Sequence, residues 1–158
     1  MQECVLELCR SAGVPARREV LIDNSGQRPA DVYFPSFRRG QPLAVDVTVS
    51  HPSQATHTNS DGETVFQSAS ERAALAKADA KNTKYLRQCQ DRGVLFQPVA
   101  ICTFGGWLPE GIQLIQELAK RGAVRTRQDF SIIVTQYWQR LGIALWCGNT
   151  TQILHCLA

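Results

Sequence analysis

Two aspartates lie inside consecutive strand-like segments of the chain, where a carboxylate is costly. Asp31 lies within RPADVYF and Asp46 within LAVDVTV. A single aspartate is more often a turn or strand-edge residue, but aspartate is depleted inside strands, and an ionised carboxylate among apolar side chains needs a cation or another charge partner. The intervening SFRRGQ segment predicts a turn at its glycine, so the two strands should pair antiparallel. Two carboxylates from adjacent strands can then bind one divalent metal ion.

A group of lysines lies in the next predicted helix, over residues 70–90. Lys77, Lys81 and Lys84 follow the i, i+4, i+7 spacing that places side chains on one face of a helix. Another side of the helix, which we expect to pack on the sheet, has Leu75, Ala78, Leu86 and Cys89. Lysines on an amphipathic helix often form only a solvated face. Beside a metal-binding carboxylate pair, however, a lysine can orient or help deprotonate a water and neutralise charge on a phosphate.

The remaining elements follow from hydrophobic periodicity and from glycine, proline and polar clusters. A polar loop separates the second aspartate strand from the lysine helix, and two further helices close the chain. The predicted elements are a helix over 2–12, a strand over 17–22, the two aspartate strands, a loop over 50–67, the helix over 70–90, a strand over 94–104, and helices over 112–121 and 129–146. This α-β-β-β-α-β-α-α order predicts an α/β fold with a mixed central sheet flanked by helices.

Length and charge limit the class of protein. A chain of 158 residues predicts a single domain, and 17 Lys and Arg against 14 Asp and Glu allow a local basic face without requiring a nucleic-acid partner. The longest uncharged stretch, residues 141–158, contains the polar run GNTT, so we expect no membrane partner. The six cysteines lack the spacing of a zinc knuckle, and we interpret them as reduced thiols of an intracellular protein.

The order of these residues resembles the PD-(D/E)XK nuclease superfamily, and more closely the restriction-like endonuclease domain of site-specific non-LTR retrotransposons. Asp31 follows a proline in PAD, 14 residues separate it from Asp46, and the sequence KNTKY at residues 81–85 matches the helix motif of those domains. Glu19 in REV is similar to the acidic residue on the strand before the first aspartate. The FQPVA and TFGG segments are similar to the strand and turn that follow the helix.

The resemblance implies a restriction-endonuclease-like core over about residues 3–107, with a helical C-terminal extension over 108–158 that has no recognisable counterpart. It implies a Mg²⁺- or Mn²⁺-dependent endodeoxyribonuclease that nicks target DNA for retrotransposon integration. Asp31 and Asp46 would bind the metal, with Glu19 reaching it through a water, and Lys81 or Lys84 would be catalytic. The residues expected to contact DNA phosphates are Arg17, Arg18, Arg38, Arg39 and Lys77.

The resemblance also implies a cellular setting. A reverse transcriptase domain of a parent polyprotein is a candidate partner beside DNA, and the location would be the nucleus if the chain comes from a eukaryotic retroelement. The target sequence, the choice between a nick and a double-strand cut, and the oligomeric state do not follow from the sequence.

One departure from the family pattern leaves an alternative function open. Thr48 occupies the position where simpler superfamily members have the lysine of the acidic-x-Lys motif. It shares the strand face of Asp46, so a lysine from the helix could take the missing role. Without such a lysine the chain would be a catalytically inactive nuclease-fold module that binds DNA or protein. A small α/β hydrolase that uses Cys102 or His51 is a third hypothesis, but no nucleophile motif supports it.

Overall fold

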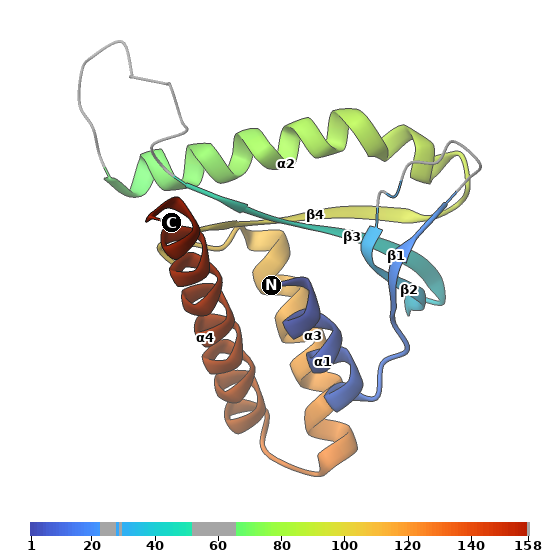
Figure 1. The fold of residues 1–158 in the computed structure, drawn as a ribbon. Coiled ribbons are helices and arrows are strands. Elements are labelled where there is room, and N and C mark those ends of the chain that lie inside the picture. Colours follow the sequence, from blue (N-terminus) through green and yellow to red (C-terminus); the bar gives the residue numbers. More distant parts are fainter. Residues whose placement is uncertain (23–27, 29, 52–65, 158) are drawn as a thin grey trace.

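The chain folds into a sheet with helices on both faces (Figure 1). The computed structural model describes residues 1–22, 28, 30–51 and 66–157, and side chains are described for all of these except 66–70 and 152–157. Over this part of the chain the elements are α1 (Gln2–Ala12), β1 (Arg17–Val20), β2 (Ala30–Arg38), β3 (Gln41–Ser50), α2 (Phe66–Gln90), β4 (Leu95–Cys102), α3 (Pro109–Thr126) and α4 (Phe130–Leu157). The predicted order of elements and the mixed α/β class are confirmed.

The sheet is mixed and open, with the strand order β1-β2-β3-β4. The first three strands pair antiparallel, and β4 pairs parallel with β3. Parallel neighbours need a crossover connection, and α2 lies in that connection. It covers one face of the sheet, while α1, α3 and α4 lie on the other (Figure 1).

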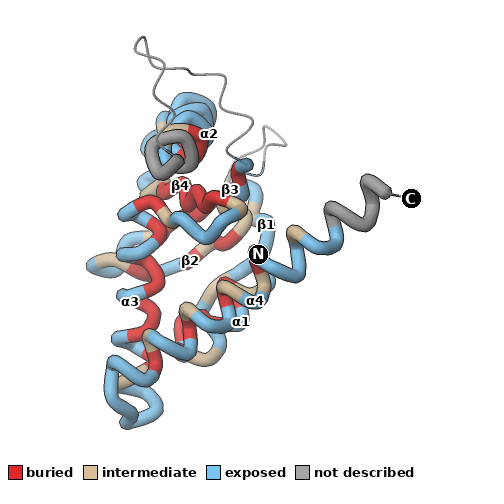
Figure 2. The backbone as a smooth tube through the Cα atoms, turned by 90° about the vertical axis from the view of Figure 1, so that its left-hand side faces the viewer, coloured by how far each residue is buried: buried red, intermediate tan, exposed pale blue. Residues whose placement is uncertain are grey.

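The larger core lies on the face opposite α2. Buried side chains of β2 and β3, such as Phe34 and Val45, pack with Leu8 of α1, Leu118 of α3 and Leu141 of α4. Figure 2 shows the buried positions concentrated in the sheet and on the inner sides of these helices. None of the helices in the described part of the chain is both long and apolar enough to cross a membrane.

The face under α2 is built from smaller side chains. Ala74 and Ala78 of α2 are buried against Ala100 of β4, and Cys89 near the end of the helix packs on Ala44 of β3. Alternation along β3 therefore places Ala44 toward α2 and its neighbours Leu43 and Val45 toward the large core, as the sequence predicts. Because the next residue in step with Ala44 is Asp46, the second aspartate also faces α2.

Several predicted boundaries are wrong. The turn expected over 36–41 is limited to Arg39 and Gly40, which have φ values of 51° and 80°, because β2 continues to Arg38. The strand predicted over 94–104 is limited to 95–102, and it is continuous through Pro98 because β4 lies at the sheet edge, where a missing N–H is tolerated. α3 is longer than predicted at both ends, and α4 is longer than predicted at its C-terminal end. Most of the loop predicted over 50–67 lies outside the described residues.

The side of α2 predicted to pack on the sheet is buried at Ala78 and Cys89 but not at Leu75. Leu75 is 44% exposed, whereas Ala73, Ala74 and Ala78 are buried. The helix presents its smallest side chains to the sheet, and this choice also changes where the lysines point.

Candidate active site

Three carboxylates form a row across neighbouring strands. The pairs Val32–Val45 and Tyr33–Ala44 between β2 and β3 set a register that places Asp31 opposite Asp46. On the other side of β2, the pairs Arg18–Val32 and Val20–Ala30 place Glu19 opposite Asp31. Like charges directly opposite one another in a sheet are destabilising, so this row requires compensation.

Asp46 is compensated by a lysine from α2. The Nζ of Lys81 lies 2.9 Å from Oδ1 of Asp46 in a salt bridge, and Thr48 donates a hydrogen bond of 3.1 Å from Oγ1 to Oδ2. Asp46 is only 3% exposed. A buried carboxylate with both oxygens bonded is held in one orientation.

Asp31 has no cation of its own among the described residues. Its Oδ2 accepts a hydrogen bond of 2.7 Å from the backbone N–H of Val47. Burial raises the pKa of Asp31 above its ordinary value; the Val47 hydrogen bond opposes this rise, the negative charge of Asp46 adds to it, and Lys81 lowers the pKa again. These influences show that Asp31, Asp46 and Lys81 share one electrostatic environment, and that Asp31 is the carboxylate least compensated within it.

Glu19 is neutralised by arginines at the edge of the sheet. Arg18 Nε and Arg28 Nη1 lie 3.3 Å and 3.0 Å from its two oxygens. The residue has a φ of 46°, which is unusual for a side-chain-bearing residue. Its charge still raises the pKa of Asp31 slightly, as the weakest of the influences on that group, and its role as a metal ligand through a water stays a prediction.

The spacing predicted one stripe of equivalent lysines on α2, but the three lysines have different surroundings. Lys81 lies three residues after Ala78 and four before Tyr85, and both of these side chains are buried. Residues with this spacing share one side of a helix, so Lys81 points toward the sheet, where it contacts Asp46. Lys84 instead lies over the ring of Tyr85, with Nζ 4.7 Å from the ring centroid, and Lys77 is exposed. Between the two catalytic candidates, the structure brings Lys81 and not Lys84 to Asp46.

Tyr85 is a part of this site that sequence reasoning missed. It is 7% exposed, packs edge-on against Phe96 of β4, and has the amino groups of Lys81 and Lys84 at 5.7 Å and 4.7 Å from its ring centroid. Such cation–π contacts hold ammonium groups over the ring. The four-residue spacing of Lys81 and Tyr85 could have indicated their contact. Nothing in the sequence indicates the hydrogen bond from the Val47 N–H to Asp31.

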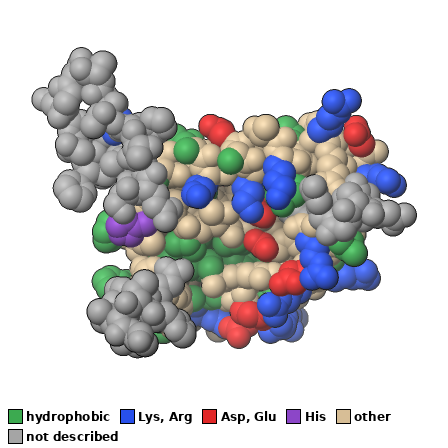
Figure 3. All heavy atoms as spheres, turned by 45° about the horizontal axis from the view of Figure 1, so that its top comes forward, with side chains coloured by type: hydrophobic (Ala, Val, Ile, Leu, Met, Phe, Trp, Pro, Cys, Tyr) green, Lys and Arg blue, Asp and Glu red, His purple; other side chains and the backbone are tan. Residues whose placement is uncertain are grey.

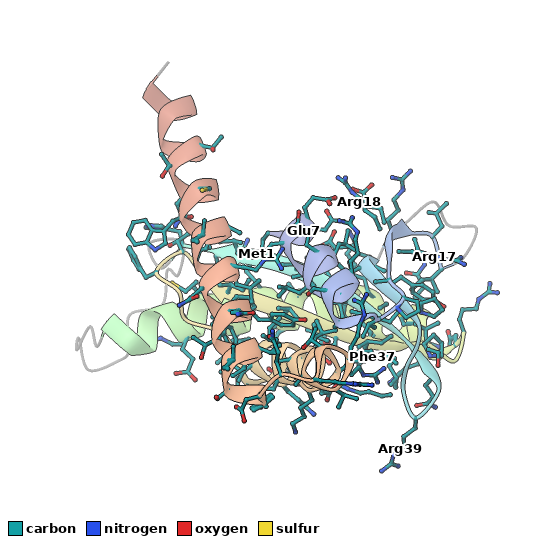
Figure 4. The ribbon with its side chains drawn as sticks, turned by 90° about the horizontal axis from the view of Figure 1, so that it is seen from below. Met1, Glu7, Arg17, Arg18, Phe37 and Arg39 are labelled. Atoms are coloured by element: carbon teal, nitrogen blue, oxygen red, sulfur yellow. The ribbon has the colours of Figure 1, made fainter. Side chains whose placement is uncertain are left out.

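The residues predicted to contact DNA do not all gather near the carboxylates. Figure 3 looks onto α2 and shows basic side chains across this face with acidic side chains beside them. Arg17 and Arg18 lie on β1, where Arg18 pairs with Glu3 at 2.9 Å. Arg38 and Arg39 lie at the far tip of the β2–β3 hairpin, from which Arg39 projects away from the protein (Figure 4). Arg38 is paired there with Glu117.

A magnesium ion fits the carboxylate pair better than a metal that requires a closed cage of side chains. Within the described residues, no group of three or more His, Cys, Asp or Glu side chains is placed to hold a metal. Mg²⁺ usually keeps several waters and takes only one or two carboxylates together with substrate phosphates. Asp31 and Asp46 supply two such carboxylates, and the uncompensated charge of Asp31 favours an added cation.

No protein family model, curated protein or solved structure matches this chain.

Proposed function

We propose that this protein is a metal-dependent DNA endonuclease with a restriction-endonuclease-like core, related to the restriction-like endonuclease domain of site-specific non-LTR retrotransposons. The observation that carries the proposal is the convergence of three groups on one face of the sheet. Asp31 and Asp46 lie opposite each other on β2 and β3, and Lys81 reaches Asp46 from α2 at 2.9 Å. Carboxylates from neighbouring strands with a lysine beside them are the parts that the nuclease superfamily uses.

The metal would be held by Asp31 and Asp46. When bound, Mg²⁺ or Mn²⁺ would polarise the scissile phosphate and lower the pKa of a coordinated water. Asp31 is suited to this role because its charge has no cationic partner among the described residues, and because the Val47 N–H fixes one of its oxygens. The role of Asp46 is supported by its burial and by the two hydrogen bonds that set its orientation.

Lys81 would supply the group that a lysine at position 48 supplies in simpler relatives. An ammonium group has three donors, so Lys81 can hold Asp46 with one of them and present the others to the attacking water or to a phosphate oxygen. Its side chain is 33% exposed, so solvent and substrate can reach it. Hydrolysis adds one water across one P–O ester bond, and a fixed positive charge offsets the negative charge that develops on the phosphate.

The exposed basic residues would position DNA without reading its sequence. Lys77 and Lys84 on α2 and Arg17 on β1 lie on elements beside the carboxylates and can contact phosphates, which fix the register of a duplex. A reverse transcriptase domain in a parent polyprotein and a nuclear location would accompany this role in a eukaryotic retroelement.

A plasmid-nicking assay tests the proposal. Supercoiled DNA is incubated with the protein in Mg²⁺, in Mn²⁺ and in EDTA, beside Asp31→Asn and Asp46→Asn. The matched control is Asp79→Asn, which removes the same charge from an exposed position on α2. We expect nicking that requires the metal, survives in the control, and is lost in the two site variants. Metal-independent nicking that persists in both site variants would eliminate the nuclease proposal.

A DNA-binding module without catalysis is the second candidate, and one observation favours it. Both oxygens of Asp46 are already bonded within the protein, by Lys81 and Thr48, so the carboxylate could be part of a purely structural ion pair. In that case the protein should bind DNA equally well in Mg²⁺ and in EDTA and should leave plasmid DNA intact.

A further inference from the structure

A second basic site lies at the tip of the β2–β3 hairpin. A cavity of about 660 Å³ opens between the end of the hairpin and α3. Four of its lining residues are cations, and one is a carboxylate: Arg38, Arg39, Lys120, Arg121 and Glu117. The cavity therefore has an excess of three positive charges, whereas the whole chain has a formal net charge of only +3.

Two of the arginines are held in place by the protein. Arg121 donates a hydrogen bond of 2.6 Å to the carbonyl of Phe37, and its guanidinium lies 4.5 Å from the centroid of the Phe37 ring. Phe37 is itself buried in the large core, two residues before Arg39, which projects from the hairpin tip (Figure 4). A guanidinium fixed in this way loses little rotamer entropy when it binds an anion.

Arg38 has an unused donor inside the protein. Its Nε lies 3.0 Å and 3.2 Å from the two oxygens of Glu117. Its terminal nitrogen Nη2 is buried and has no hydrogen-bond partner among the described residues. A buried donor without an acceptor is costly, and native proteins rarely leave one unpaired. Because Arg38 lines the cavity, an anion bound there could supply the acceptor if the side chain turned this nitrogen toward it.

We propose that this cavity binds a phosphate group, either free or as part of a polynucleotide backbone. Guanidinium groups match phosphate oxygens in geometry and bind them with charge-assisted hydrogen bonds. The single carboxylate is already occupied by Arg38, and Gln113 also donates to it at 3.1 Å, so it repels an incoming anion less than a free carboxylate would.

The phosphate site is separate from the carboxylate site. Its helical wall is α3, on the opposite face of the sheet from α2. Arg38 lies seven positions after Asp31 on β2, which is roughly 20 Å along a strand. The phosphate site therefore does not depend on the proposed nuclease activity. If its ligand is DNA, the contact would lie about six base pairs from the carboxylates, at 3.4 Å per pair.

Two binding measurements test the proposal and identify the source of the phosphate. The first follows the thermal midpoint and heat of binding with inorganic phosphate, compared with chloride at equal ionic strength. The second follows the anisotropy of a labelled DNA duplex in EDTA, where no metal-dependent cleavage can occur. The test variants are Lys120→Gln with Arg39→Gln, which spare the contacts of Arg38 and Arg121, and Glu117→Gln. The control is Arg127→Gln, which removes one charge from the exposed turn before α4.

We expect the double variant to weaken binding roughly tenfold and Glu117→Gln to strengthen it, since Glu117 is the only carboxylate among the described residues that line the cavity. These opposite effects in the phosphate arm would identify free phosphate as a ligand, and the same effects in the duplex arm alone would identify the nucleic-acid backbone. If every variant matches the Arg127→Gln control in both arms, the proposal is wrong. If the phosphate proposal fails in this way but Mg²⁺-dependent nicking is intact, the nuclease proposal still stands. If phosphate binds as expected but no nicking is seen, only the nuclease proposal is overturned.

Discussion

Replacing Asp31 with asparagine should abolish most of the stabilisation by divalent metal, so that the variant is more stable than the wild type without metal and less stable with it. Asparagine keeps a carbonyl oxygen that can accept the hydrogen bond from the Val47 N–H, so the local geometry survives while the negative charge is lost. In the metal-free protein this change removes the repulsion between Asp31 and Asp46. In the presence of metal it removes half of the proposed ligand pair.

The size of both effects can be bounded. Opposed like charges on adjacent strands cost about 1 kcal/mol at most, so Asp31→Asn should raise the midpoint in EDTA by roughly 2–4 °C for a chain of this length. A cation at ten times its dissociation constant should stabilise the wild type by about 1.4 kcal/mol. The variant should lose most of that gain, so it should be the more stable protein in EDTA and the less stable one in Mg²⁺.

The pH dependence has a definite sign. Because the folded state raises the pKa of Asp31 above 3.8, the folded protein binds this proton more tightly than the unfolded chain, and the cost of the charge is relieved as the pH falls through the raised pKa. The advantage of Asp31→Asn in EDTA should therefore be full at neutral pH and shrink on acidification toward the ordinary value. Differential scanning fluorimetry at several pH values measures both effects, with Asp79→Asn as the control. Equal metal-induced shifts in wild type and Asp31→Asn would refute the metal site.

Three further outcomes follow from the same contacts. Lys81→Ala should abolish nicking under saturating DNA while changing DNA affinity little. Lys84→Ala should keep most of the activity, because Lys81 and not Lys84 contacts Asp46. Equal rates for both variants and the wild type would exclude a catalytic lysine on α2. Thr48→Lys in the Lys81→Ala background should restore part of the nicking, since position 48 already reaches Asp46 Oδ2, and no recovery in a folded double variant would argue against an exchange of lysine positions. Burial raises the pKa of Cys9 to about 12 whereas Cys147 is exposed, so peptide mapping after brief iodoacetamide treatment at pH 8 should find Cys147 labelled and Cys9 protected until the protein unfolds.

Period-two alternation was sufficient to predict the strands and the orientation of Asp46. A carboxylate between Val45 and Val47 must face away from both, and the structure places it under α2 as expected. The order of elements followed from the same patterns. Boundaries did not, because the residues at the hairpin and at the ends of the helices fit more than one local conformation and tertiary packing decides among them.

The orientation of α2 could be predicted only in part. Helical spacing groups Lys77, Lys81 and Lys84, but it does not say which side of a helix rich in alanine faces the sheet. The side expected to face the sheet is buried at Ala78 and Cys89, but Leu75 is exposed and Ala74 packs against the sheet instead. A choice made by shape rather than by hydrophobicity leaves little trace in a single sequence.

This choice of helix face is also what brings a lysine to the carboxylates. Alanines at the contact with Ala100 allow α2 to approach the sheet closely, and the helical repeat then places Lys81 in the same row, one turn beyond Ala78. Were Leu75 to face the sheet instead, the helix would rotate and Lys81 would turn away from Asp46. The ammonium group compensates Asp46, and Arg18 with Arg28 compensates Glu19, which leaves Asp31 as the one member of the row without a cation in the described part of the chain. The uncompensated carboxylate of Asp31 thus lies beside the fixed ammonium group of Lys81. The proposed nuclease would need the first to bind the metal and the second to contact the phosphate.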